Sequence, residues 1–471
     1  MTRPVTTTAA PAADDDVSVP ANPPTSAYRY LVLFLLTGVY TFNFLDRQIM
    51  GILAPAIQAE FALSDSQLGF LSGIAFAILY TTLGIPIARL ADRHNRVTII
   101  AVSLAVWSGF TALCGLAANF WQLAAARIGV GIGEAGGTPP AHALISDYFP
   151  KEARAGALAI YSMGIPIGIT IAYLGGGWIV QNFDWRTAFL GLGIPGVLLA
   201  VILRLIVREP ERGLSDRIAA TKKGEPLPAK PTTPDGALFE IGALWRAAGQ
   251  LLRIPTYANM LTAQTAVSFA SYATSAFTVL FFLRSHPDFD KLAVYGWLGV
   301  INGTAYVAGV FAGGRFVDKF AAKDKTAYGS VPAWAMILYI PFFIGAIWVG
   351  SPVWCLILLW PVHFLVGIHL GPGFALAQTL APVHMRALST AIYFFVLNLI
   401  ALGLGPSITG VLSDLFAGMP NVTADIGLRL AMTTTLVPVI IGIFAFWRVT
   451  KTVVRDWEIA AKRHHEPKTA D

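Results

Sequence analysis

Charged residues are scarce in this chain of 471 residues. Asp, Glu, Lys and Arg make up 13% of the sequence, and hydrophobic residues make up 55%. A soluble domain carries about 25% charged residues, so the composition excludes a soluble protein with an ordinary core. Apolar runs of about 18 residues or more recur along the whole chain, and each is long enough to cross the hydrocarbon of a bilayer. Together with a mean hydropathy of +0.62, these runs predict an all-α polytopic membrane protein.

The sequence also has little that would build a metal site, a disulfide framework or a nucleotide-driven motor. Its two cysteines, Cys114 and Cys355, lie in apolar runs, where packing is their ordinary role. No GxxxxGK[ST], HExxH or CxxC motif occurs. No strand precedes the glycines between Gly129 and Gly133, which argues against a dinucleotide loop. We therefore expect no metal and no cofactor, with protons as the coupling ion.

Basic residues lie on alternate sides of the apolar runs. The even-numbered loops carry Arg89, Arg93, Arg96, Lys151, Arg154, Arg315, Lys319, Lys323 and Lys325, whereas the odd-numbered loops are poor in Lys and Arg. This is the positive-inside pattern, so the net charge of +6 does not indicate a nucleic-acid partner. With an even number of spans it predicts a cell-membrane protein with both termini in the cytoplasm, and we expect a monomer in the lipid bilayer.

Twelve spans are expected from the length that a membrane helix needs. They begin near Tyr28, Ser66, Val97, Phe120, Arg154, Arg186, Pro255, Leu292, Val331, Val353, Arg386 and Ile426. No cleavage site with an apolar h-region precedes the first span, which we expect to act as an uncleaved signal anchor.

The spans divide into two halves. The composition of residues 1–26 predicts a disordered tail. We expect one bundle of six helices in 27–208 and a second bundle of six helices in 254–450. A cytoplasmic linker, 209–253, is expected to join them, and a cytoplasmic tail, 451–471, to follow. Within the linker, 238–252 is weakly amphipathic. It fits a helix on the inner leaflet and equally fits an ordinary loop that leads into the seventh span.

Two short motifs repeat between the halves in the same order. Ala88–Arg93 and Gly314–Lys319 share the pattern small-Arg-apolar-apolar-Asp-cation. Later, Arg154 precedes Tyr161 at the same spacing at which Arg386 precedes Tyr393, with Ala-Ile before each tyrosine. Internal repeats of this kind are typical of secondary transporters whose two bundles are related by pseudo-symmetry.

The stretch 120–147 carries two ionisable residues inside an apolar, glycine-rich span. Arg127 and Glu134 are separated by about two helical turns and therefore share a face. A charge at membrane depth costs about 2.5–3.5 kcal/mol on insertion scales. We therefore expect these residues to form an ion pair, to contact water or to have a functional role. Gly129, Gly131 and Gly133 allow neighbouring helices to come close. We interpret this face as the lining of a polar cavity that a substrate crosses.

Asp46 in the first span is the expected partner of Arg127. Counting 1.5 Å per residue places Asp46 about 27 Å along its span and Arg127 about 10 Å below the outer surface, so the two depths agree. A carboxylate keeps its charge beside a guanidinium and takes up a proton when it is buried without one, which makes Asp46 a candidate for proton coupling. Glu134 is the second candidate. The alternatives are that Asp46 lies in outer water beside Arg47, and that Glu134 is a structural carboxylate.

Two further groups of polar residues are assigned from position. Gating of the cytoplasmic side is assigned to the repeated loops and their neighbours, with Asp92 expected at the start of the next helix: Asp92, Arg93, Arg96, Asp147, Arg154, Arg315 and Asp318. Cavity lining is assigned to polar side chains within spans: Asn43, Tyr80, Gln264, Ser268, Tyr272, Asn302, Tyr306, His363, His369, Gln378, Tyr393 and Asn398, with Arg127. For a lone membrane histidine, packing is the commoner role.

These features resemble the major facilitator superfamily. Its loop motif corresponds to Ala88–Arg96, its fourth-helix motif to Arg127, Gly131 and Gly133, and its eleventh-span glycine motif to Gly403, Gly405-Pro406 and Gly410. Ala88, Asn95 and Val97 depart from the first motif. The segments Tyr40–Arg47 and Arg127–Ala135, with Gly69, Tyr80 and Ser146-Asp147, resemble the spinster-type transporters. That resemblance implies export of lysophospholipids or sphingoid phosphates, with protons at the first-helix Asp and the fourth-helix Arg.

The sequence therefore predicts a secondary transporter with alternating access that is coupled to protons and moves a lipid-like amphiphile. A carrier of a small organic anion or drug is the alternative, but it would want a second cation facing Arg127, and 353–382 contains no Lys or Arg. A membrane lipid enzyme would need a catalytic cluster, and His142, Asp147 and Asp318 do not suggest one. A receptor would need a sizeable soluble domain, which the sequence lacks.

Overall fold

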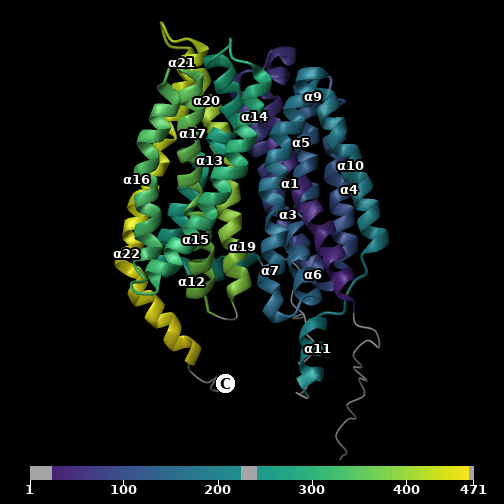
Figure 1. Ribbon diagram of the computed structural model, residues 1–471. Helices are drawn as coiled ribbons and strands as arrows, with labels where there is room; N and C mark the ends of the chain where they lie inside the picture. Colours follow the sequence, from purple (N-terminus) through teal and green to yellow (C-terminus); the bar gives the residue numbers. More distant parts are fainter. Residues whose placement is uncertain (1–23, 224–240, 383–384, 466–471) are drawn as a thin grey trace, which may run out of the picture.

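The computed structural model describes residues 24–223, 241–382 and 385–465. Within these ranges the chain is helical and contains no strand. Figure 1 shows two bundles of long helices side by side, the first from the N-terminal half and the second from the C-terminal half. The N-terminal bundle contains α1 (Ser26–Phe61), α2 (Asp65–Ser72), α3 (Ile74–Arg93), α4 (Arg96–Cys114), α5 (Phe120–Glu134), α6 (Thr138–Tyr148), α7 (Lys151–Ser162), α8 (Gly164–Ile171), η1 (Ala172–Gly176), α9 (Gly177–Asn182) and α10 (Trp185–Ile206).

Two linker helices and the C-terminal bundle follow. The linker helices are α11 (Leu214–Lys223) and α12 (Ile241–Leu252). The C-terminal bundle contains α13 (Pro255–Ser285), α14 (Lys291–Ile301), η2 (Asn302–Tyr306), α15 (Val307–Ala321), α16 (Ala327–Trp348), α17 (Pro352–Gly367), α18 (Leu370–Leu380), α19 (Arg386–Leu397), η4 (Asn398–Leu404), α20 (Gly405–Ala417), α21 (Ala424–Thr434) and α22 (Leu436–His465). Part of the amphipathic stretch is thus a helix, α12, whereas 238–240 lies outside the described residues.

Eleven helical segments of the described chain are long and apolar enough to cross a membrane. The remaining predicted crossing runs through α5 and α6, which turn at 135–137 and are each too short to span alone. The predicted starts of the spans agree with the observed starts to within a few residues. The expectation of an all-α protein with membrane-crossing helices is therefore confirmed.

Side-chain caps explain where several of these helices begin. Ser64 and Gln67 form a reciprocal capping box at the start of α2, and the side chains of Asn119, Asp184 and Asp290 accept hydrogen bonds from the first turns of α5, α10 and α14. The expectation that Asp92 lies at the start of the next helix is wrong. Asp92 lies in the last turn of α3, and the Asn95 side chain caps α4 through the Thr98 amide at 2.8 Å.

The two bundles meet most closely at one end. α1 begins and α22 ends at the same end of the molecule, called here the terminal end, and the opposite end is called the far end (Figure 1). Toward the far end, α2 packs against α20, α1 against α13, and α9 against α14. Gly69 of α2 lies against the Pro406 backbone, and Gly410 of α20 lies against the Asp65 backbone. Glycine permits this close approach because it has no Cβ.

The glycines of α5 have the role expected from the sequence. Gly131 lies against the backbone carbonyl of Phe76 in α3, Gly133 against the backbone of Trp107 in α4, and Gly129 against the ring of Phe110 in α4. These contacts hold α5 in the middle of the N-terminal bundle and fix the depth of Arg127 and Glu134.

Substitution of Gly131 tests this packing. A Cβ at this position would overlap the Phe76 carbonyl, so we expect Gly131→Ala to lower the stability of the detergent-solubilised protein by about 1–3 kcal/mol, measured as a fall in Tm. Gly84→Ala on α3 is the matched control, since a Cβ there meets no atom within 4 Å. Equal melting temperatures for the two variants would contradict the close packing of α5.

Candidate functional site

A buried ion pair joins α1 to α5 in the N-terminal bundle. The Arg47 guanidinium donates from Nε to Glu134 Oε2 at 2.9 Å, and the Asn43 amide donates to the same oxygen at 2.8 Å. Asn43 and Arg47 are one helical turn apart, so both side chains leave α1 on the face that meets Glu134. Glu134 is 1% exposed. Two donors on a buried carboxylate satisfy the requirement that a charge inside a membrane protein be paired.

Asp46 and Arg127 lie deeper in the same bundle. Asp46 is 2% exposed and accepts a hydrogen bond from Thr111 Oγ1 of α4 at 2.9 Å, so a position in outer water does not fit it. Arg127 lies above the Phe76 ring, 5.4 Å from its centroid, and its Nε reaches the Leu71 carbonyl only at 3.5 Å. Among the described residues, Asp46 and Arg127 form no ion pair within 4 Å. The expected direct contact is therefore absent in this conformation.

Three polar atoms around these charges have no hydrogen-bond partner within the described part of the chain. They are Arg127 Nη1, Glu134 Oε1 and Asn43 Oδ1, and all are buried. A buried polar atom left without a partner costs about 1–3 kcal/mol, and such atoms in a native fold mark places where a water molecule, a proton or a polar group of a ligand is accommodated. The cluster therefore has the chemistry of a polar binding site inside an apolar bundle.

Aromatic rings surround Arg47 and reach across to the second bundle. The Arg47 guanidinium lies 4.6 Å from the Tyr80 ring centroid, 5.2 Å from that of Phe44 and 5.4 Å from that of Phe76, within the range of cation–π attraction. The Tyr272 side chain of α13, in the C-terminal bundle, interacts with Arg47 as well. Arg47, rather than Arg127, is thus the cation at the face between the bundles.

Sequence reasoning treated Arg47 only as a neighbour of Asp46 and missed this role. The signal was the spacing of Asn43 and Arg47 by four residues, which places an amide and a cation on one helical face. Consecutive residues point about 100° apart on a helix, so Asp46 and Arg47 could not both face the same partner.

Several other predicted lining residues make contacts inside the C-terminal bundle instead. His369 Nδ1 lies 2.6 Å from Gln264 Oε1, and the Gln264 amide donates to the His369 carbonyl. Asn302, Asn398 and His363 bond to carbonyls of their own helical segments. The others are dispersed: Ser268 and Tyr393 are buried, Tyr306 is partly exposed, and Gln378 is exposed. Of the predicted set, Tyr80 and Tyr272 interact with Arg47, and Asn43 shares its carboxylate partner Glu134.

Three of the predicted gating residues, Arg96, Asp147 and Arg154, bind the linker and one another at the terminal end. Arg96 donates to Asp147 at 2.5 Å and to Glu209 at 2.6 Å, and Arg154 pairs with Asp216 at 3.1 Å. Arg93, Arg315 and Asp318 are exposed. No ion pair between the two bundles involves Asp92, Arg315 or Asp318 within the described residues.

A polar network at the far end does connect the bundles. Arg284 at the end of α13 holds both carboxylate oxygens of Asp65 at the start of α2, at 2.6 and 2.7 Å. Asp414 of α20 accepts from the Asp65 amide at 3.0 Å and the Ser66 amide at 2.8 Å, and from the Ser66 hydroxyl. We call Asp65, Ser66, Arg284 and Asp414 the far-end latch. Sequence reasoning assigned none of them, because their proximity depends on how the two bundles meet.

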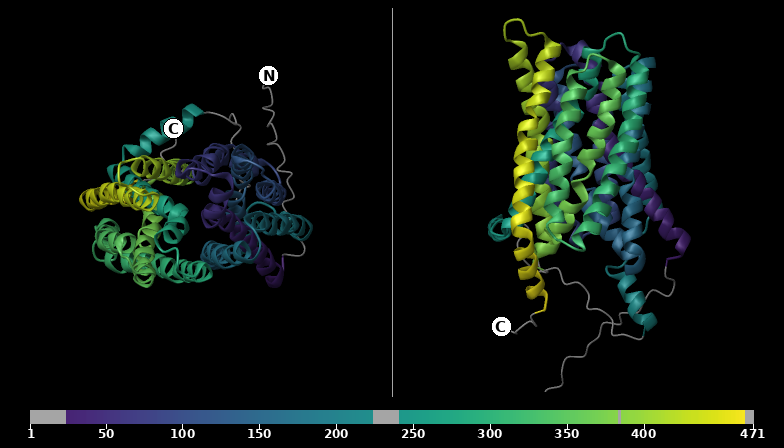
Figure 2. Two further views of the ribbon diagram at one scale, coloured as in Figure 1. Left: turned by 90° about the horizontal axis from the view of Figure 1, so that it is seen from above. Right: turned by 60° about the vertical axis from the view of Figure 1, so that its left-hand side comes forward.

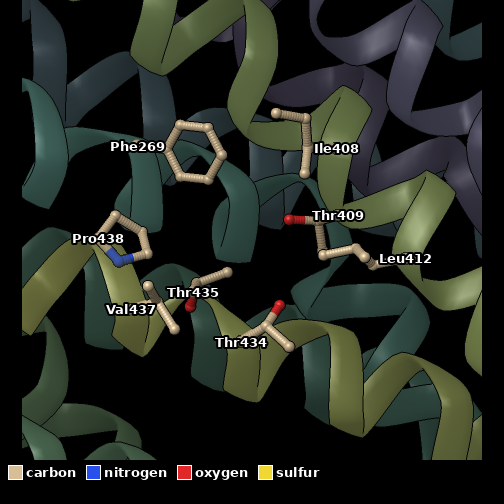
Figure 3. Close-up of a pocket in the computed structure, with 8 residues that line it drawn as sticks. All are labelled: Phe269, Ile408, Thr409, Leu412, Thr434, Thr435, Val437 and Pro438. Carbon is tan, nitrogen blue, oxygen red and sulfur yellow. The ribbon is translucent and has the colours of Figure 1, made fainter.

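A cavity of about 340 Å³ in the C-terminal bundle is distinct from this charged site. It lies between α13, α20 and the junction of α21 with α22, and Figure 3 shows its lining by Phe269, Ile408, Thr409, Leu412, Thr434, Thr435, Val437 and Pro438. The hydroxyls of Thr434 and Thr435 bond to carbonyls of their own helix. The described lining is neutral, with three threonines among apolar residues.

The family model of the Major Facilitator Superfamily matches residues 36–406. The chain belongs to the Major Facilitator Superfamily. Within this superfamily it is similar to the MFS-type efflux pump of Mycolicibacterium smegmatis, with 29% identity over 438 residues that cover 92% of this chain and 95% of the relative. The human protein spinster homolog 1 is 30% identical over 263 residues, which are 54% of this chain and 46% of that protein.

A solved structure of a bacterial homologue of the human lysosomal transporter Spinster is also similar. That structure, which is inward-facing and unoccupied, matches with a TM-score of 0.79 and 30% identity over 92% of this chain and 99% of that chain. The expected resemblance to spinster-type members of the Major Facilitator Superfamily is confirmed. The family and fold are those of a membrane transporter and not of an enzyme.

Loss of the far-end latch is expected to open that end. Arg284→Gln leaves the Asp65 carboxylate without its cation, and hydrogen bonds to charged groups contribute about 1.5–3 kcal/mol, so the equilibrium should move roughly tenfold or more toward the opened form. Double electron–electron resonance measures the opening as the distance between spin labels at Leu116 and Met419, one on each bundle. Arg186→Gln, which breaks an ion pair to Glu60 inside one bundle, is the control. Identical distance distributions in both variants would show that the latch does not hold the bundles.

Proposed function

We propose that this superfamily member is a secondary transporter that moves a lipid-like amphiphile with an anionic headgroup and couples its movement to protons. The observation that carries the proposal is the Arg47–Glu134 ion pair at 2.9 Å. It joins a permanent cation to a titratable acid, and its cation faces the second bundle through Tyr272. The resemblance to spinster-type transporters supports the choice of substrate.

The headgroup and Glu134 compete for Arg47 in this mechanism. An anionic group that binds the guanidinium draws Arg47 away from Glu134, which remains buried with only Asn43 as donor. A buried carboxylate that loses its cation is stabilised by taking up a proton. Anion and proton therefore occupy the site together, and release of the anion lets Arg47 recover Glu134 and displace the proton.

Asp46 and Arg127 form the second part of the proposed coupling site. Arg127 is 1% exposed and has one guanidinium nitrogen without a partner in the described protein. Its positive charge balances Asp46 deep in the bundle, so the four charged side chains are together neutral when all are ionised. A change of protonation at Glu134 alters that charge balance, and Asp46 would respond by a change in its own protonation.

The apolar surroundings of Arg47 favour an amphiphile over a small polar anion. Phe44, Phe76 and Tyr80 lie around the guanidinium, and such rings provide apolar area beside a charged centre. Carriage of a small organic anion or a drug is the second candidate, favoured by the similarity to an efflux pump over 92% of this chain.

The distribution of basic residues supports a cytoplasmic terminal end. With the far-end latch closed, the conformation described here is then closed toward the outside. Alternating access would require the latch to break while the terminal end closes, with Asp92, Arg93, Arg96, Asp147, Arg154, Arg315 and Asp318 as proposed gating residues.

Transport in proteoliposomes tests the proposal. Uptake of a phosphate-bearing lysolipid driven by a pH gradient is expected to fall at least tenfold in Arg47→Gln, because the headgroup loses its cation, and Arg186→Gln is the control with the same change of charge. In Glu134→Gln, substrate exchange should persist while the response to the pH gradient is lost. Full coupling in Glu134→Gln would refute the role of this carboxylate, and uptake of a small dicarboxylate in place of the lysolipid would favour the second candidate.

A further inference from the structure

A cavity bordered by charged side chains lies at the terminal end of the C-terminal bundle, far from Arg47 in the sequence and on other helices. It has a volume of about 230 Å³ and lies where the α12–α13 junction meets the end of α18 and the last third of α22. Its lining consists of Arg253, Ile254, Pro255, Leu380, Arg455, Asp456 and Ile459. Two guanidinium groups thus border a pocket whose other walls are largely apolar.

The positive charges of this cavity face outward and its negative charge faces inward. Asp456 is only 4% exposed, and its carboxylate accepts from the Thr256 amide at 2.9 Å, at the start of α13, and from Arg455 at 2.9 Å. Arg455 is 62% exposed. Arg253 is exposed and forms no ion pair among the described residues. The surface that a ligand meets is therefore cationic.

Apolar side chains at the same level indicate contact with a membrane. Leu252, Val454 and Ile459 are each more than 40% exposed beside the two arginines. Figure 2 shows α12 lying across the direction of the long helices rather than along it. A helix in the membrane plane with cations next to exposed aliphatic residues is the arrangement by which proteins bind a lipid interface, and cations there attract anionic headgroups.

We propose that this cavity binds the headgroup of an anionic membrane phospholipid. Arg253 and Arg455 hold the phosphodiester, and the apolar wall of Ile254, Leu380 and Ile459 takes the first part of an acyl chain. The bound lipid would connect the end of the linker, α13 and α22, and so anchor the C-terminal bundle to one leaflet. This site is independent of the transport mechanism proposed above.

Binding of phosphatidylglycerol to the purified full-length protein in detergent tests this inference, with native mass spectrometry as the readout. The double variant Arg253→Gln/Arg455→Gln should bind phosphatidylglycerol about 25-fold more weakly, because each of the two interfacial cations contributes about fivefold. The control Arg448→Gln/Lys462→Gln removes the same charge from exposed positions of α22 outside the cavity and should leave this binding unchanged. Phosphatidylcholine should bind weakly to all forms.

The single variant Arg253→Gln keeps the test decisive if loss of Arg455 unfolds the protein, since Arg253 supports no ion pair among the described residues. It should weaken binding about fivefold. Equal loss in the cavity and control variants would overturn the proposal by showing a diffuse effect of charge. Displacement of the lipid by glycerol phosphate at similar concentration would also overturn it, because the site would then bind a soluble phosphate rather than a lipid.

Discussion

A carboxylate buried in the middle of a membrane bundle must be paired, and Arg47 pairs with Glu134. Removal of one partner from a buried ion pair typically costs about 3–5 kcal/mol, so this bond ties α1 to α5 strongly. The same ion pair also lets the N-terminal bundle respond to a bound ligand. The same guanidinium faces the second bundle through Tyr272, so a ligand that takes Arg47 changes the charge state of the first bundle. Structure and proposed mechanism depend on this one bond.

The glycine contacts and the far-end latch place this pair at a junction that can move. Gly131 and Gly133 fix α5 against α3 and α4 through backbone contact, which makes the N-terminal bundle a rigid carrier of the charges. Between the bundles, the described contacts at the far end include a bidentate ion pair and an aspartate that caps the start of α2, beside the close approach of Gly69 and Gly410 to the facing backbone. The polar bonds of the latch can exchange for water when the far end opens, and the glycine contacts of α2 with α20 separate at the same time, whereas the contacts of Gly131 and Gly133 lie inside one bundle and are kept. The bundles can therefore rock against each other without loss of their own cores.

The fold was largely predictable because the membrane imposes helix length and polarity. Apolar runs predicted the helix starts, and the two repeated motifs fall at matching places, in the last turns of α3 and α15 and along α7 and α19. Burial of Asp46, Arg127 and Glu134 was also foreseeable from the cost of charges in hydrocarbon. The pairing was not. The pairing of these charges depends on helical phase and on a few ångströms of depth. These decide that Glu134 bonds to Arg47 and that Asp46 bonds to Thr111. Contacts between bundles, such as that of Asp65 with Arg284, depend on the conformational state and leave no periodic signal.

The central claim is that an anion on Arg47 and a proton on Glu134 bind together. Proton exchange on ligand binding measures this directly, with a pH-indicator dye in weakly buffered detergent solution and a phosphate-bearing lysolipid as ligand. The account predicts uptake of close to one proton for each ligand bound by the unmodified protein, and none by Glu134→Gln, although that variant still binds the ligand. Binding without proton uptake in the unmodified protein, or the same uptake in Glu134→Gln, would contradict it.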